Sequence, residues 1–220
     1  MQDNGFPVAM PVVYQHTINN QSQLAVWEIR EPLSYFLEQL EIAVPFMHPK
    51  KQLQFLASRL LLKYLEPGFP FEKVMIGTGG KPFIPDCEVN FSISHCGDYA
   101  AVIISKKSDV GIDVELINPK ATKLNRKFLS ETERALFSNE ADQTRINRQS
   151  TLCWSIKETM FKWYGKGGVD FKKHLEITEL PETDSGHVKA LFKKESLIEL
   201  NIHYVLIQDL YLTWTQHKFI

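Results

Sequence analysis

The segment DVGIDVE, residues 109–115, constrains the fold of this chain more than any other stretch. Its β-branched residues and its alternation of apolar and acidic side chains are typical of a β-strand. Because side chains in a strand alternate between two faces, Asp113 and Glu115 share one face, with Cα atoms roughly 6.6 Å apart at about 3.3 Å per residue. The opposite face is apolar and consists of Val110, Ile112 and Val114.

Two carboxylates on one strand face repel each other, and burying them without a positive partner costs on the order of several kcal/mol per ion. A metal ion or a basic group between Asp113 and Glu115 would relieve this repulsion. Oxygen ligands favour Mg²⁺, which proteins bind through one or two carboxylates together with substrate phosphates. The pattern therefore predicts a phosphate-bearing ligand. An edge strand with two solvated acids is the alternative that this stretch alone leaves open.

Composition excludes several classes of protein. The 220 residues include 25 basic and 26 acidic ones, and a formal charge of -1 gives no overall field that would attract nucleic acid or a membrane surface. The three cysteines lack metal-ligand spacing and are too few for a disulfide framework, which is typical of a reducing compartment. The chain has no apolar stretch of about 18 residues and no signal-peptide pattern, so we expect a cytoplasmic protein.

The first half of the chain is predicted to contain two helices, at residues 32–42 and 49–65. Arg59 lies beside the apolar stripe of the second helix. It is either a surface residue whose stem covers the core or a cation that binds a ligand. Strands are predicted at residues 11–17, 24–29, 89–95 and 99–105.

Two polar segments of this half have the composition of phosphate contacts. Residues 79–82 (GGKP) offer flexible backbone amides beside Lys81, but they lack the Walker pattern, and an ordinary loop is the alternative. Ser94 and His95 end a predicted strand, where a hydroxyl, a ring and loop amides can converge on phosphate oxygens.

The second half is predicted to alternate turns, one short helix and one long helix before a final sheet. Asn118-Pro119 indicates a turn, and residues 139–150 are expected to be an exposed loop or connection. Ser130 with Glu133 three residues later predicts a capping box, which explains Glu133 without any chemistry. Short strands are predicted at residues 175–178, 187–192, 197–207 and 211–216.

The long helix, predicted at residues 151–164, carries Trp154, Glu158 and Lys162 at intervals of four, so these side chains share one face. A surface Glu-Lys pair, worth only about 0.2–0.5 kcal/mol, would explain two of them. In the functional interpretation, Trp154 is buried, Glu158 faces a metal ion and Lys162 reaches a phosphate one turn further on.

Taken in order, four segments of the chain closely resemble the Sfp-type 4′-phosphopantetheinyl transferases. They lie between residues 80 and 167, well under half of the chain, and each alone would be a weak signal. The segments are Gly80-Lys81-Pro82, Phe91-Ser92-Ile93-Ser94-His95, Gly111-Ile112-Asp113-Val114-Glu115, and Trp154-Ser155-Ile156-Lys157-Glu158 followed by Lys162. Members of this family use Mg²⁺ to move the phosphopantetheine arm of coenzyme A onto a carrier-protein serine, and they release adenosine 3′,5′-bisphosphate.

The resemblance implies a role for each matching residue. The metal ligands would be Asp113, Glu115 and Glu158. Glu158, or a water held by Glu115, would be the base, and Lys162 would neutralise or protonate the leaving phosphate. The phosphates of coenzyme A would contact Arg59, Lys81, Ser94, His95 and Lys162. Glu133 matches a family glutamate that serves either the structure or the metal site. The chain departs from the family at Ser92, where many members have Asn, and at Cys96, where a small hydroxyl residue is frequent.

The resemblance also implies an α+β fold with a pseudo-twofold duplication, residues 1–108 and 109–220. Each half would be a small antiparallel sheet packed on a long helix, with the active site in the cleft between the halves. The expected partner is an apo acyl, peptidyl or aryl carrier protein of fatty-acid, polyketide or nonribosomal peptide synthesis. We expect a monomer without nucleic-acid or membrane partners. Two other classes remain open. One is a different Mg²⁺-dependent enzyme that acts on a nucleotide or phosphomonoester, which turnover of coenzyme A without a carrier would favour, and the other is a non-catalytic module that binds coenzyme A or a carrier.

Overall fold

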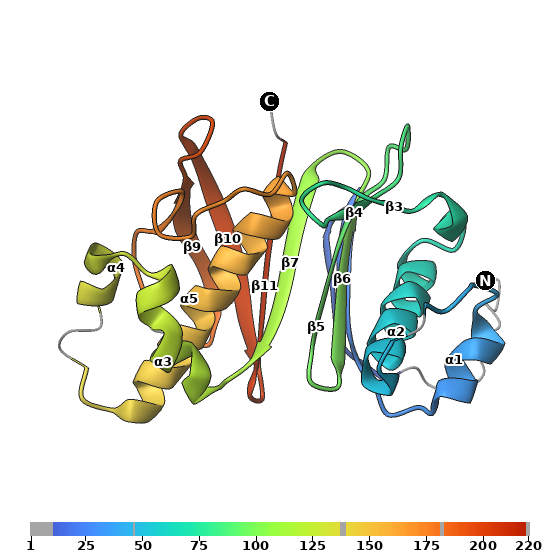
Figure 1. The fold of residues 1–220 in the computed structure, drawn as a ribbon, viewed down its shortest axis with the longest axis horizontal. Helices are drawn as coiled ribbons and strands as arrows, with labels where there is room; N and C mark the ends of the chain where they lie inside the picture. Colours follow the sequence, from blue (N-terminus) through green and yellow to red (C-terminus); the bar gives the residue numbers. More distant parts are fainter. Residues whose placement is uncertain (1–10, 46, 137–139, 181–182, 219–220) are drawn as a thin grey trace.

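A computed structural model describes residues 11–45, 47–136, 140–180 and 183–218, and its helices lie on the outer sides of two sheets (Figure 1). The first sheet, in strand order, contains β1 (Val12–Asn19), β2 (Ser22–Glu28), β6 (Tyr99–Ser105) and β5 (Asn90–Cys96). The second, in strand order, contains β7 (Asp109–Leu116), β11 (Leu210–His217), β10 (Ile198–Ile207), β9 (Ser185–Phe192) and β8 (Leu175–Ile177). All neighbouring strands are antiparallel, which confirms the predicted α+β class.

The first sheet is covered by α1 (Leu33–Gln39) and α2 (Pro49–Leu65). The predicted bounds of α2 are correct at both ends. The helix begins where the His48 side chain accepts a hydrogen bond from the Lys50 amide and Pro49 occupies the first position, a favoured place for proline. Between α2 and β5 lie a 3₁₀ turn, η1 (Phe71–Lys73), and a small hairpin of β3 (Met75–Ile76) and β4 (Pro82–Phe83).

The second sheet is covered by α3 (Pro119–Phe128), α4 (Glu131–Ala135) and α5 (Gln143–Tyr164). The predicted turn at Asn118-Pro119 is wrong, because the Asn118 side chain caps α3 by accepting from the Lys120 amide. The expected loop at 139–150 is also wrong from Gln143 onward, where α5 already begins; position 139 lies outside the described residues. The capping box that starts α4 is confirmed.

Helix α5 packs directly on β7. An added Cβ at Gly111 would lie 2.2 Å from the carbonyl oxygen of Thr159, so only glycine allows this close backbone contact. The helix buries Ile156 and Met160 against the sheet and ends at Gly165, whose φ of 70° is the left-handed conformation common after a helix. The face of β7 that carries Asp113 and Glu115 is therefore held against α5.

The other face of β7 packs against the first sheet. Val110, Ile112 and Val114 are fully buried in a core that also contains Leu24 and Ile103, which confirms the predicted alternation of the strand. The molecule thus has four layers, with α5 and α2 outermost and the two sheets inside (Figure 1). Among the described helices, none combines the length and the apolar character needed to cross a membrane.

Candidate active site

Asp113 is the centre of a polar network between β7, β5 and α5. The side chain is only 2% exposed, yet both carboxylate oxygens are satisfied. Oδ1 accepts hydrogen bonds from Ser94 Oγ at 2.8 Å and Lys162 Nζ at 2.6 Å, and Oδ2 accepts from Ser155 Oγ at 2.8 Å. Three elements thus fix the position of this carboxylate, and the Lys162 ammonium offsets its charge.

A row of hydroxyl groups extends this network into the C-terminal sheet. Ser155 Oγ lies 2.9 Å from Thr213 Oγ1, which in turn lies 2.6 Å from Thr159 Oγ1. All three residues are fully buried. Because buried hydroxyls are costly unless they are hydrogen-bonded, this row strongly specifies how α5 sits on β11 and therefore where Ser155 meets Asp113.

Glu115 lies two residues further along β7 and has different partners. Its Oε1 accepts from Trp154 Nε1 at 3.0 Å, and its Oε2 accepts from Cys96 Sγ at 3.4 Å. Burial raises the pKa of Glu115, and the charge of Asp113 raises it further. Trp154, predicted to be buried, is only partly buried, and its indole N–H donates a hydrogen bond that orients the second acid.

Glu158 completes a group of three carboxyls. Burial raises its pKa to about 7, and the charges of Asp113 and Glu115 contribute to the rise. The helical spacing therefore brings Trp154, Glu158 and Lys162 to the acids of β7, as the interval of four residues predicts.

The donor chemistry of these three carboxyls fits Mg²⁺. Burial, and after it the charge of neighbouring carboxylates, raises the pKa of both Glu115 and Glu158, and a divalent cation would relieve the repulsion. Among the described residues, however, no group of three or more His, Cys, Asp or Glu side chains is already arranged around one point as metal ligands. The carboxylates of Asp113 and Glu115 are instead oriented by hydrogen bonds from serine, lysine, tryptophan and cysteine.

Lys81 contacts backbone carbonyl groups of two elements. Its Nζ donates to the carbonyl oxygens of Val110 at 2.9 Å and Trp163 at 3.2 Å, so the ammonium connects the GGKP turn to β7 and to the end of α5. Burial lowers the pKa of Lys81 to about 8. The side chain lines a cavity of about 150 Å³ together with Lys162, but its charge is directed to backbone groups.

Arg59 and His95 line one cavity in the N-terminal half. This cavity of about 490 Å³ borders a second one of about 730 Å³, with which it shares Phe55, Arg59, Ile76 and Ile93. The Arg59 guanidinium lies over the Phe55 ring, 3.6 Å from its centroid, and burial lowers its pKa to about 10. No carboxylate of the described residues forms an ion pair with Arg59.

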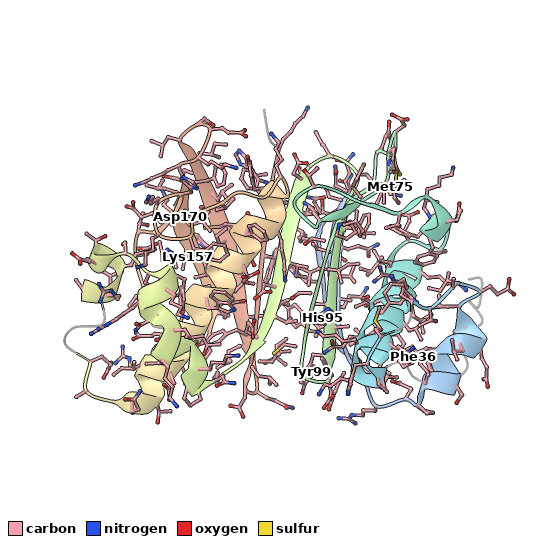
Figure 2. The ribbon with its side chains drawn as sticks, viewed as in Figure 1. Phe36, Met75, His95, Tyr99, Lys157 and Asp170 are labelled. Atoms are coloured by element: carbon pink, nitrogen blue, oxygen red, sulfur yellow. The ribbon has the colours of Figure 1, made fainter. Side chains whose placement is uncertain are left out.

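His95 projects from the end of β5 between that strand and α2 (Figure 2). Its ring remains accessible to solvent, but surrounding protein atoms lower its pKa, and the positive charge of Lys51 lowers it further. Lys51 lines the same cavity as His95 and Arg59. This cavity therefore gathers three basic side chains beside an apolar wall.

Lys157 is a residue that the sequence patterns did not single out as more than part of a motif. It is fully buried on α5, and its Nζ donates to Glu133 Oε2 at 2.7 Å and to the carbonyl oxygens of Phe128, Phe171 and Leu175 at 2.8–2.9 Å (Figure 2). Glu133 is thus fully used as a cap and as the partner of Lys157. The structural interpretation of Glu133 is the one that the contacts support.

In a comparison with known proteins, residues 109–215 match the family model of the 4′-phosphopantetheinyl transferase superfamily. A relative from Escherichia coli K12, 4′-phosphopantetheinyl transferase AcpT, is 32% identical over 122 residues, 53% of this chain and 60% of the relative. The 4′-phosphopantetheinyl transferase of Bacillus subtilis is 31% identical over 110 residues, 50% of this chain and 47% of the relative.

A third relative, the L-aminoadipate-semialdehyde dehydrogenase-phosphopantetheinyl transferase of Candida glabrata, is 30% identical over 98 residues, 41% of this chain and 38% of that protein. The matches thus span about half of the length of these relatives. The family-model match includes β7 and α5, the two elements that hold the three carboxyls. The resemblance predicted from the motifs is confirmed: residues 109–215 match the family model of the 4′-phosphopantetheinyl transferase superfamily.

Proposed function

We propose that this protein transfers the 4′-phosphopantetheine arm of coenzyme A to a serine of an apo acyl, peptidyl or aryl carrier protein. The products are the holo-carrier and adenosine 3′,5′-bisphosphate. The observation that supports this proposal most strongly is the convergence of Asp113, Glu115, Glu158 and Lys162, from two elements of the region that matches the superfamily. Phosphoryl transfer depends mainly on positioning and on neutralising charge, and this group provides both.

Asp113, Glu115 and Glu158 would hold Mg²⁺. The ion, when bound, polarises the pyrophosphate of coenzyme A and stabilises the charge that develops on its oxygens. The hydrogen bonds from Ser94 and Ser155 keep the Asp113 carboxylate at a defined place, so this ligand is oriented before anything binds.

Glu158, or a water held by Glu115, accepts the proton of the carrier serine as its oxygen attacks the phosphorus atom on the pantetheine side. One P–O bond forms to the serine oxygen, and the P–O bond to the bridging oxygen breaks. Lys162 neutralises the leaving phosphate or gives it a proton. Its side chain is 24% exposed, and its ammonium group already lies at the centre of the site, 2.6 Å from Asp113.

The nucleotide end of coenzyme A would lie in the N-terminal half. Arg59 and His95 line the same cavity, and an arginine without a carboxylate partner is well suited to a phosphate group. Ser94 contacts Lys162 at 2.7 Å and is near the pyrophosphate in this arrangement. Lys81 has a different part, because its ammonium binds two carbonyl groups; we assign it to the frame of the cleft.

The same proposal includes the arrangement of the halves. Residues 1–108 and 109–220 would be a pseudo-twofold duplication with the active site in the cleft between them. In support, each part contributes one antiparallel sheet covered on its outer side by one long helix, α2 or α5.

The test is incubation of the protein with coenzyme A, Mg²⁺ and an apo carrier, followed by intact-mass spectrometry of the carrier. The wild type should add the phosphopantetheine mass, and EDTA should suppress the addition. Glu158→Gln keeps the shape of the side chain but loses its charge and basicity, so it should be inactive while it remains folded by circular dichroism. If several apo carriers stay unmodified by folded wild type that binds coenzyme A, the transferase proposal fails.

A further inference from the structure

Strand β7 carries two of the three carboxyls, and within the described part of the chain it is the end strand of its sheet. One of its edges pairs with β11. Backbone groups of alternate residues point to the other edge, which no strand covers. An open edge of this kind, buried inside a protein, would leave polar backbone groups without partners.

Side chains of the N-terminal half satisfy this edge one after another. The amide of Ile112 donates to Ser92 Oγ at 3.3 Å, and the amide of Val114 donates to Ser94 Oγ at 3.2 Å. The remaining two contacts lie at opposite ends of this edge. The Leu116 amide donates to Cys96 Sγ at 3.4 Å, and Lys81 Nζ donates to the carbonyl oxygen of Val110 at 2.9 Å. We call these four hydrogen bonds the edge contacts.

The spacing of the edge contacts follows from strand geometry. Ser92, Ser94 and Cys96 are alternate residues of β5, so their side chains point the same way, and they meet alternate amides of β7. β5 itself pairs by its backbone only with β6 within the described residues. The two sheets are therefore joined here by side chains and not by a strand pair. Positions 92 and 96 therefore each carry a small side chain that can accept a hydrogen bond from β7.

The edge contacts lie on either side of the acids. Asp113 lies between the bonded amides of Ile112 and Val114, and Glu115 lies between those of Val114 and Leu116. A shift of β7 along β5 would break all three amide contacts at once and would move both carboxyls relative to the cations of the N-terminal half. These contacts thus fix the position of the sheet that carries the acids relative to the sheet that carries His95.

We propose that Ser92 and Cys96 are positioning residues. They hold β7 in the register along β5 in which Asp113 and Glu115 face the ligand of the N-terminal half. The effect on turnover rests on the proposed function; the effect on β7 does not. Ser92 is the clearest case, because it is 2% exposed and its hydroxyl accepts from Ile112 without contacting any of the three carboxyls.

The experiment measures amide hydrogen exchange by NMR in the full chain, without coenzyme A or carrier, for Ser92→Ala and the control Ser22→Ala. Ser22 Oγ donates to Ser105 Oγ at 2.8 Å, so each variant removes one buried hydroxyl contact from the same sheet, but only Ser92 contacts β7. Exchange at Ile112 is divided by exchange at Leu212 of β11, which removes the effect of any general loss of stability.

Ser92→Ala should raise this exchange ratio about tenfold, because it leaves a buried amide without an acceptor, whereas Ser22→Ala should leave the ratio unchanged. Ser92→Cys, which supplies the kind of acceptor present at position 96, should restore it. If Ser92→Ala does not fold, Cys96→Ala against Cys96→Ser, read at Leu116, makes the same comparison. Equal ratios in Ser92→Ala, Ser22→Ala and the wild type would overturn the proposal.

Turnover separates positioning from a merely structural contact. In a protein that transfers phosphopantetheine, Ser92→Ala should lower kcat about tenfold with little change in the KM for coenzyme A, and Ser92→Cys should recover kcat. Faster exchange at Ile112 with unchanged kcat would overturn the positioning role. If the wild type modifies no carrier, the proposed function fails by itself, and the exchange ratio still decides whether Ser92 holds β7.

Discussion

The two halves of the molecule differ in how their buried charged groups are partnered. In the C-terminal half, Asp113 is paired with Lys162 and Glu133 with Lys157. In the N-terminal half, Arg59 lines two cavities and forms no ion pair with the described carboxylates. In the C-terminal half these charged side chains are already held in place by their partners, whereas the N-terminal half has a positive charge and a cavity available for a ligand.

The largest effect on carrier modification is expected from the buried carboxylate Asp113. Asp113→Ala removes a carboxylate that Ser94, Ser155 and Lys162 hold in place, and we predict a loss of carrier modification of at least about 10²-fold. The thermal melt should still be cooperative. Glu199→Ala, a change at an exposed acid of β10, is the control and should transfer normally. Wild-type rates for Asp113→Ala at saturating Mg²⁺ would contradict the assignment.

The buried pair of the C-terminal half should dominate stability. Lys157→Met leaves Glu133 and three carbonyl groups without their shared donor, so the free energy of unfolding should fall by about 3–5 kcal/mol in urea titrations. Lys189→Met breaks an exposed pair with Glu199 and should change it by less than about 1 kcal/mol. A similar, small change in both variants would remove the distinction between buried and exposed pairs.

Arg59 of the N-terminal half should affect the binding of coenzyme A more than the stability of the fold. Arg59→Met should lower the free energy of unfolding by only about 1 kcal/mol, because it loses the stacking on Phe55 and a hydrogen bond to Ser58 but no ion pair. It should weaken coenzyme A binding by about 10-fold or more. Calorimetric titration with coenzyme A and with dephospho-coenzyme A measures both affinities. Lys81→Met should leave the ratio of the two affinities unchanged, since its ammonium binds carbonyl groups. If Lys81→Met changes the ratio of the two affinities and Arg59→Met does not, Lys81 and not Arg59 contacts the phosphate that dephospho-coenzyme A lacks.

The contribution of Lys81 to stability should depend on pH. Burial lowers the pKa of Lys81 to about 8 in the folded protein, below its ordinary value of 10.5. Between these two values the unfolded chain binds more protons than the folded one, so the contribution of Lys81 to stability should rise as pH increases from about 8 to 10. Urea titrations of the wild type and Lys81→Met across this range measure the contribution as a difference. A difference that falls with pH would contradict the lowered pKa.

The same contrast explains what could be predicted from the sequence. Local signals were sufficient for α2, whose proline start and apolar spacing set both ends, and for the alternation of β7. The position of Glu158 and Lys162 beside the acids of β7 followed from helical spacing. In α3, the Asn-Pro pair was interpreted as a turn although the same pair also caps a helix, and the polar first turns of α5 resembled a loop.

Other features depend on contacts between distant segments. Nothing near Lys157 in the sequence predicts that Glu133 and three carbonyl groups will surround it, because these partners come from 14 to 29 positions away. The role of Lys81 likewise depends on Val110 and Trp163, which belong to the other half. A lysine beside glycines has the same local pattern whether it binds a phosphate or a backbone carbonyl.

The central claim is that the acids of the C-terminal half break the pyrophosphate of coenzyme A only in exchange for a bond to a carrier serine. The most direct measurement counts both products of one reaction: holo-carrier by intact-mass spectrometry and adenosine 3′,5′-bisphosphate by chromatography. We predict equal amounts of the two, and neither product when the carrier serine is replaced by alanine. Bisphosphate released without any modified carrier would contradict the account and would indicate a hydrolase that acts on coenzyme A.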